Sequence, residues 1–131
     1  MHFPPRTLGR FGEMRAVWFY RLRGYRILAR NLRSKCGEID LVVRRGATVV
    51  IVEVKTRQTL IAGEGHDAVD RKKREQLVRL GDRYTASSPG VQLRYDILSI
   101  LWTGWRFVVS HYADAFRPES DPTRPWLWRV D

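Results

Sequence analysis

The feature that most constrains the fold is a pair of Val- and Ile-rich segments joined by a two-residue turn. They run from Glu38 to Arg45 and from Thr48 to Thr56, and this composition favours β-strands. The connecting Gly46-Ala47 places glycine first in the turn, which a type II′ hairpin prefers. We therefore predict an antiparallel hairpin in which Arg45 faces Thr48.

This register gathers ionisable side chains on one face of the hairpin. Because side chains alternate along a strand, that face carries Glu38, Asp40, Glu53 and Lys55. Asp40 then faces Glu53, with Cβ atoms roughly 4.5–5.5 Å apart. The opposite face is apolar and is the predicted core face, comprising Ile39, Leu41, Val43, Val50, Val52 and Val54.

Two facing carboxylates need compensation for their mutual repulsion. At an effective dielectric constant near 20, charges about 5 Å apart repel by about 3 kcal/mol. A hard divalent cation such as Mg²⁺ relieves this repulsion, because it takes carboxylate oxygens as ligands. Asp40 and Glu53 are therefore candidate metal ligands. The alternative is a solvated sheet face on which Glu38 and Lys55 form an ion pair.

The segments around the hairpin predict a mixed α/β domain. Helices are expected from Thr7 to Arg23 and from Asp67 to about Tyr84, and further strands over Tyr25–Leu32, Val91–Leu101 and Arg106–Tyr112. The order α-β-β-β-α-β-β predicts one mixed β-sheet flanked by helices.

An apolar stripe marks each predicted helix, and such a stripe is the face that a helix turns toward a core. In the first helix the stripe is Phe11, Met14, Trp18 and Leu22, with arginines on the other faces. In the second helix it is Val69, Lys73, Leu77, Leu80 and Tyr84. A lysine in that stripe either extends from the edge of the core or reaches a functional face.

The chain of 131 residues is strongly basic. Its 24 Lys and Arg residues against 14 Asp and Glu give a net charge of +10, which favours a polyanionic partner. Nucleic acid is the partner expected first, and an anionic membrane surface is the alternative. The single cysteine, Cys36, excludes an internal disulfide, and no apolar run approaches the ~18 residues of a transmembrane helix. We expect a cytoplasmic protein.

Two motifs in the hairpin resemble a known family. Gly37-Glu38-Ile39-Asp40, followed by Glu53-Val54-Lys55-Thr56-Arg57, is similar to the YraN-like family of the PD-(D/E)XK nuclease superfamily. Further matching segments are 9–13, 24–31, 94–96 and 115–116. The resemblance covers about residues 9–116, so that 1–8 and 117–131 are predicted to be tails outside an endonuclease-like domain.

The resemblance implies a restriction-endonuclease-like fold and metal-dependent phosphodiester hydrolysis. Asp40 and Glu53 would bind Mg²⁺ or Mn²⁺, helped by the backbone carbonyl of Val54. Lys55 would orient the attacking water and stabilise developing charge, and Glu13 matches a first-helix glutamate that completes the metal shell. Branched or damaged DNA is the implied substrate class, ahead of RNA. A resolvase-like activity would predict a homodimer, because two symmetrical cuts need two sites.

Basic residues near these motifs are candidate contacts to a nucleic-acid backbone. They are Arg57 together with Lys72, Lys73 and Arg74 of the run that opens the second helix. The alternative for this run is a charged helix surface. Asp96, two residues after Arg94, is expected to be a salt-bridge or structural carboxylate.

Two other functions are compatible with this sequence. The first is a catalytically silent nucleic-acid-binding module with a nuclease-like fold. The second is a ribosome- or membrane-associated adaptor that uses the positive charge and the aromatic C-terminal segment.

Overall fold

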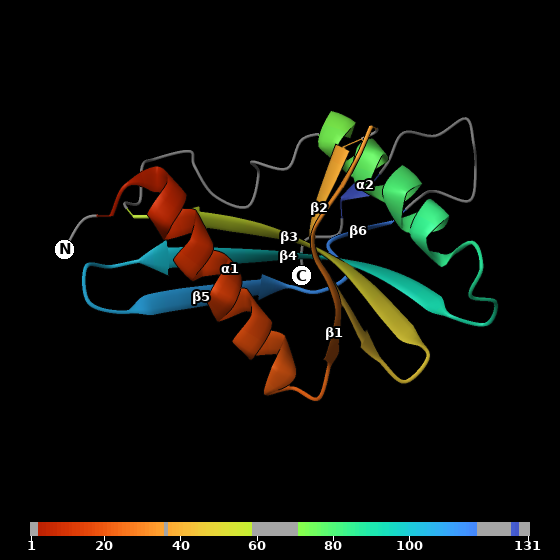
Figure 1. Ribbon diagram of the computed structural model, residues 1–131, viewed down its shortest axis with the longest axis horizontal. Coiled ribbons are helices and arrows are strands. Elements are labelled where there is room, and N and C mark those ends of the chain that lie inside the picture. Colours follow the sequence, from red (N-terminus) through yellow and green to blue (C-terminus); the bar gives the residue numbers. More distant parts are fainter. Residues whose placement is uncertain (1–2, 36, 59–70, 118–126, 129–131) are drawn as a thin grey trace.

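The computed structural model describes residues 3–35, 37–58, 71–117 and 127–128. A five-stranded mixed sheet is flanked by two helices (Figure 1), in the order α-β-β-β-α-β-β that the sequence predicts. The elements are α1 (Pro5–Arg21), β1 (Arg26–Ser34), β2 (Gly37–Arg45), β3 (Thr48–Arg57), α2 (Arg71–Thr85), β4 (Gln92–Trp102) and β5 (Phe107–Tyr112), with a short pair β6 (Phe116–Arg117) and β7 (Leu127–Trp128). No described helix has the length and apolar character needed to span a membrane.

The predicted hairpin forms with the predicted register. Strands β2 and β3 pair antiparallel, and Arg45 faces Thr48 while Leu41 faces Val52. Strand β4 pairs parallel with β3 along its length, and β1 and β5 complete the two edges of the sheet in antiparallel pairing. The parallel pair follows from the segment with α2 that connects β3 to β4, since parallel neighbours need a crossover connection.

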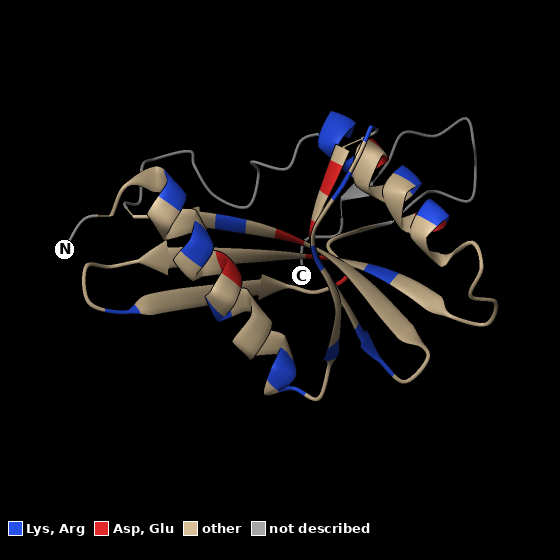
Figure 2. Cartoon of the chain, in the orientation of Figure 1, with Lys and Arg blue, Asp and Glu red and all other residues tan. Residues whose placement is uncertain are grey.

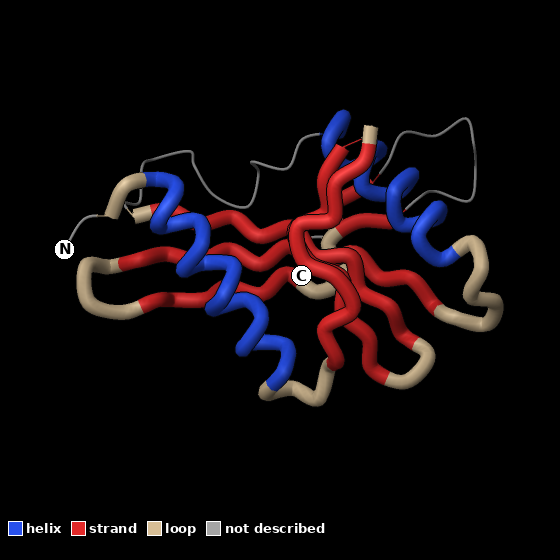
Figure 3. Tube along the Cα trace, in the orientation of Figure 1, coloured by secondary structure: helices blue, strands red, loops and turns tan. Residues whose placement is uncertain are grey.

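Both faces of the central strands are buried, as expected for strands inside a sheet covered by helices. Successive residues of β3 alternate between two core clusters, with Val50 packing toward α1 and Ile51 toward α2. The two helices therefore cover opposite faces of the sheet. Figure 3 shows α1 crossing in front of the strands. The prediction of a single apolar core face was incomplete.

The alternation of side chains in β2 changes around Asp40. Ile39 packs in the cluster with α2, whereas Leu41 packs in the cluster with α1, although the two residues were predicted on one face. The backbone pairing of β2 with β3 ends at Leu41, so the first residues of β2, from Gly37 to Ile39, pair with β1 alone. Asp40 thus lies where the two strands separate.

The predicted orientation of the first helix was wrong. Its expected core stripe is exposed to solvent: Phe11 by 45%, Met14 by 42%, Trp18 by 50% and Leu22 by 75%. The buried face consists instead of Leu8, Gly12, Ala16, Val17, Phe19 and Tyr20. This face packs on the sheet because it carries small residues: a Cβ atom on Gly12 would overlap the side chain of Thr56 in β3.

The buried face of α2 includes Leu77 and Leu80 as predicted, and also Arg74, Val78 and Gly81. Asp67 and Val69, predicted as the N-cap and first stripe residue of this helix, lie outside the described residues.

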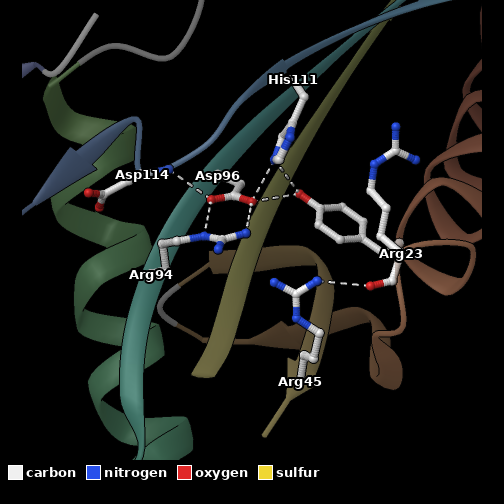
Figure 4. A network of polar contacts seen from close by, with 7 residues as sticks. Arg23, Arg45, Arg94, Asp96, His111 and Asp114 are labelled. Atoms are coloured by element: carbon white, nitrogen blue, oxygen red, sulfur yellow. Dashed lines mark hydrogen bonds and ion pairs between the residues drawn. The ribbon is translucent and has the colours of Figure 1, made fainter. Parts of the chain in front are cut away.

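A buried polar network fixes α1 to the sheet (Figure 4). Asp96, which is 1% exposed, accepts two hydrogen bonds from Arg94 at 2.8 and 2.9 Å and one from the Tyr20 hydroxyl at 2.9 Å. His111 Nε2 lies 2.8 Å from the same carboxylate, and the backbone N–H of Asp114 donates to it at 2.9 Å. The predicted structural role of Asp96 is confirmed.

These contacts also set the protonation of Asp96. Burial alone would raise the pKa of this carboxyl, but its hydrogen bonds with His111, Arg94 and the Asp114 N–H lower the pKa to about 2. The network therefore holds a charged carboxylate beneath α1 at neutral pH.

Candidate functional site

The candidate site lies where β2 and β3 separate. The backbone N–H of Val54 donates a hydrogen bond of 2.9 Å to Oδ2 of Asp40, so this side chain bridges to β3 beyond the last backbone pair. Because Val54 directly follows Glu53 on β3, this hydrogen bond places Asp40 beside Glu53, and the negative charge of Asp40 raises the pKa of the Glu53 carboxyl. The two residues predicted as metal ligands are thus neighbours, at the point where the strands diverge.

Glu53 is the more deeply buried member of this pair, at 5% exposure. Burial, followed by the negative charge of Asp40, raises the pKa of Glu53 to about 7. Burial also raises the pKa of Asp40, against the lowering effect of the Val54 N–H. Within the described part of the chain, Oε2 of Glu53 has no hydrogen-bond partner.

Two lysines from different elements face Glu53. Nζ of Lys55, on β3, lies 3.5 Å from Oε1 of Glu53, and Nζ of Lys73, on α2, lies 3.8 Å from Oε2. Both lysine side chains are partly exposed, so their ammonium groups lie between the buried carboxylate and solvent. The site therefore combines a carboxyl pair with two cations.

Two alternatives were predicted for Lys73 from its place on the apolar stripe of α2: extension from the edge of the core, or a position at the functional face. The contact with Glu53 agrees with the second alternative, and a role in binding nucleic acid stays a prediction. The ion pair between Glu38 and Lys55 that belonged to the alternative, solvated-face interpretation is not the one described: Glu38 lies 3.7 Å from Arg33 on β1, and Lys55 faces Glu53. Because Glu53 is only 5% exposed, the face is not solvated at this residue.

The carboxyl pair fits a hard divalent cation. Such ions bind carboxylate oxygens, and Mg²⁺ commonly uses one or two carboxylates while keeping several waters. The buried Glu53 oxygen without a hydrogen-bond partner is the atom that a cation would satisfy. No group of three or more Asp, Glu, His or Cys side chains that could hold a metal ion lies within the described ranges, so the candidate site offers the two carboxylates of Asp40 and Glu53.

The chain is similar in sequence to proteins of one family. The model of the uncharacterised protein family UPF0102 matches residues 12–100, a range that contains Asp40, Glu53, Lys55 and Lys73. The chain belongs to this family. A UPF0102 protein of Nocardia farcinica is 41% identical over 113 residues, covering 84% of this chain and 89% of the relative. A UPF0102 protein of Chlorobium phaeobacteroides strain BS1 is 36% identical over 124 residues, covering 88% and 98%.

Membership of UPF0102 supports the YraN-like resemblance drawn from the hairpin motifs. The family match runs from Gly12 to Ile100, so it includes the second half of α1, β1, the hairpin, α2 and most of β4. The site residues are thus part of the segment that defines the family.

Glu13 of this UPF0102 protein lies on α1, with its Oε2 accepting a hydrogen bond of 3.1 Å from Asn31 Nδ2 on β1. Asn31 has a positive φ of 50°, close to the irregularity in the β1–β2 pairing. No interaction described for Glu13 joins it to Asp40 or Glu53. Its role as a further metal ligand stays a prediction.

The predicted nucleic-acid contacts differ in their accessibility. Lys72 is exposed, Lys73 is partly exposed, and Arg74 is buried at 7% exposure. Arg57 follows Lys55 on β3 and donates from Nη2 to Ser99 Oγ at 3.2 Å. Lys72 is therefore the most accessible member of this set, whereas Lys73 already faces Glu53.

Proposed function

We propose that this UPF0102 protein is a metal-dependent nuclease of the PD-(D/E)XK type that hydrolyses phosphodiester bonds. The observation that carries the proposal is the buried Glu53 carboxyl, which precedes the residue whose N–H binds Asp40 and which is faced by Lys55. A purely structural carboxylate is normally satisfied by hydrogen bonds, as Asp96 is in this protein, whereas Glu53 has a buried oxygen without one among the described residues.

Asp40 and Glu53 would hold Mg²⁺ or Mn²⁺, with the carbonyl of Val54 as a further oxygen donor. The bound ion would supply Lewis-acid activation of the scissile phosphate. The ammonium group of Lys55 would orient the attacking water and stabilise negative charge on the phosphate oxygens. Lys73, on the other side of Glu53, would hold the substrate phosphate and keep the carboxylate ionised.

The charge of the protein favours a nucleic-acid substrate. The net charge is +10, and Figure 2 shows Lys and Arg on both helices and along the strands. We propose DNA ahead of RNA, with branched or damaged DNA as the substrate class. A homodimer would supply the two sites needed for paired cuts in a branched substrate.

The test is cleavage of end-labelled branched, flapped, single-stranded and duplex DNA, and of RNA, in Mg²⁺, Mn²⁺ or EDTA. The wild-type protein should cut at least one substrate in a metal-dependent manner; Asp40→Asn should abolish the cutting and Lys55→Ala should slow it by about 10²–10³-fold. Glu38→Gln is the matched control, because Glu38 shares the strand with Asp40 but pairs with Arg33.

Two outcomes would contradict the proposal. Cutting that survives in both site variants would indicate a contaminating nuclease. Salt-sensitive binding of nucleic acid without cutting of any substrate would instead identify a catalytically silent binding module.

A further inference from the structure

The solvent-facing side of α1 carries an unexplained row of large apolar side chains. Phe11, Met14, Trp18 and Leu22 are exposed by 45%, 42%, 50% and 75%, and Phe3 extends the row by packing its ring 5.0 Å from that of Phe11. A surface helix normally has one apolar stripe and a polar opposite face. Here the inner stripe is already filled by the contacts with the sheet, so α1 has apolar stripes on two sides.

The outer row is narrow and straight. With 3.6 residues per turn, the four side chains span an arc of about 80°. A helix that packs on a globular core or lies in a membrane interface has a wider apolar face, of about 100° or more, whereas a narrow seam is typical of pairing with one other helix. The spacings of three, four and four residues are those of anchors in helix recognition.

Charge determines which helix can pair with this seam. Arg10 and Arg21 lie along one edge of the row and Arg15 along the other, and Arg21 lies 5.4 Å above the ring of Trp18. Figure 2 shows that basic residues recur along α1. The acidic residue of α1, Glu13, bonds to Asn31 rather than balancing these arginines.

A second copy of this chain fits the seam poorly. Pairing α1 with itself would bring arginine-lined edges together, in a protein whose net charge is already +10. Charges that flank a helical seam set partner choice, and like charges oppose pairing. The complementary surface is therefore a helix with an apolar seam flanked by Asp or Glu.

We propose that the outer face of α1 docks an acidic amphipathic helix of a partner protein. The apolar seam of that helix would cover the row from Phe11 to Leu22, and its acidic flanks would pair with Arg10, Arg15 and Arg21. This interaction surface is independent of Asp40 and Glu53, because it belongs to the outer side of a helix whose inner side contacts the sheet.

The test uses two synthetic helical peptides of about three heptads with the same leucine seam, one flanked by Glu and the other by Lys. Binding to the full chain is measured by fluorescence anisotropy. The Glu-flanked peptide should bind at least about tenfold more tightly than the Lys-flanked peptide. Trp18→Gln and Leu22→Gln should each weaken binding by about tenfold or more.

Matched variants separate docking from folding and from nonspecific adhesion. Trp105→Gln removes a tryptophan that is 75% exposed in the turn between β4 and β5, and it should leave binding unchanged. The double variant Arg10→Glu/Arg15→Glu should invert the preference toward the Lys-flanked peptide. Circular dichroism melts should show that the variants remain folded.

Three results would overturn the proposal. One is equal binding of both peptides, or binding of neither. A second is wild-type flotation with phosphatidylglycerol vesicles that Trp18→Gln abolishes, which would assign the row to a lipid surface. The third is a dimer in analytical ultracentrifugation that Trp18→Gln dissociates, which would assign the row to a second copy of the chain.

Discussion

Replacing Glu53 with glutamine should stabilise the metal-free protein above neutral pH. In the folded chain burial and the charge of Asp40 raise the pKa of Glu53 to about 7 from its ordinary value of 4.5. At 1.36 kcal/mol per pKa unit, this difference in pKa corresponds to about 3 kcal/mol of the free energy of unfolding. Glutamine is similar in shape and stays neutral, so it removes the charge without opening a cavity.

The sign of this effect follows from proton linkage. Because the folded-state pKa is raised, the folded protein binds a proton more tightly than the unfolded chain between pH 4.5 and about 7. The contribution of Glu53 to stability is fully present below pH 4.5 and is lost as the pH rises through about 7. The stability difference between Glu53→Gln and wild type should therefore grow from near zero at pH 4.5 to up to about 3 kcal/mol at pH 8.

The assay is urea unfolding of both proteins in EDTA at pH 4.5, 6, 7 and 8, followed by circular dichroism. At pH 8 the variant should also melt roughly 10 °C higher than wild type. Glu38→Gln is the control, since this partly exposed carboxylate should change stability by less than about 1 kcal/mol at every pH. A Glu53→Gln variant that is less stable than wild type at pH 8 would refute the reasoning.

Three further changes have defined outcomes. Gly12→Ala should destabilise the protein by about 1–3 kcal/mol in urea unfolding, because its Cβ atom would overlap the side chain of Thr56. Gly9→Ala is the control: a Cβ atom there meets no atom within 4 Å, so this variant should be as stable as wild type or more stable. Asp96→Asn should lower the free energy of unfolding by about 3–5 kcal/mol at pH 7. The loss should shrink as the pH falls toward about 2, because the wild-type carboxylate itself becomes protonated there. A difference in unfolding free energy that stays constant from pH 7 to pH 2 would contradict this. Lys55→Met should slow cleavage by about 10²–10³-fold in single-turnover assays while metal binding persists, and an unchanged rate would exclude its proposed role.

The hairpin register was predictable from local chemistry. Gly46 has a φ of +60° in a tight turn, and this turn fixes which residues of β2 and β3 face each other. Strand alternation predicted Asp40 directly opposite Glu53, but the backbone pairing ends one residue earlier, at Leu41 and Val52. The register prediction succeeded because it depends on contacts between residues close in the sequence.

The orientation of α1 was not predictable from apolar spacing alone. Large apolar residues occur on two sides of this helix, and periodicity does not state which side meets the sheet. The decisive residues are Gly12 and Ala16, whose small side chains let α1 approach β3 closely. A stripe of small residues was therefore a better signal of the buried face than the stripe of large ones.

The position of Lys73 beside Glu53 depends on how α2 crosses the sheet. Helical spacing places Lys73 on the same side as Leu77, but the height and angle of the helix over β3 come from packing. The Val54 N–H that binds Asp40 is likewise released by the separation of two strands, which a regular hairpin does not reveal.

The most direct test of the proposed metal site is calorimetric titration of Mn²⁺ into the wild-type protein and the Asp40→Asn and Glu53→Gln variants at pH 8. The result needs no knowledge of the substrate. We predict saturable binding by the wild type, loss of binding in both variants, and unchanged binding in Glu38→Gln. Because Glu53 must lose its proton to bind, wild-type affinity should fall between pH 8 and pH 6. Binding of Mn²⁺ that both site variants retain would contradict the assignment of Asp40 and Glu53 as the metal ligands.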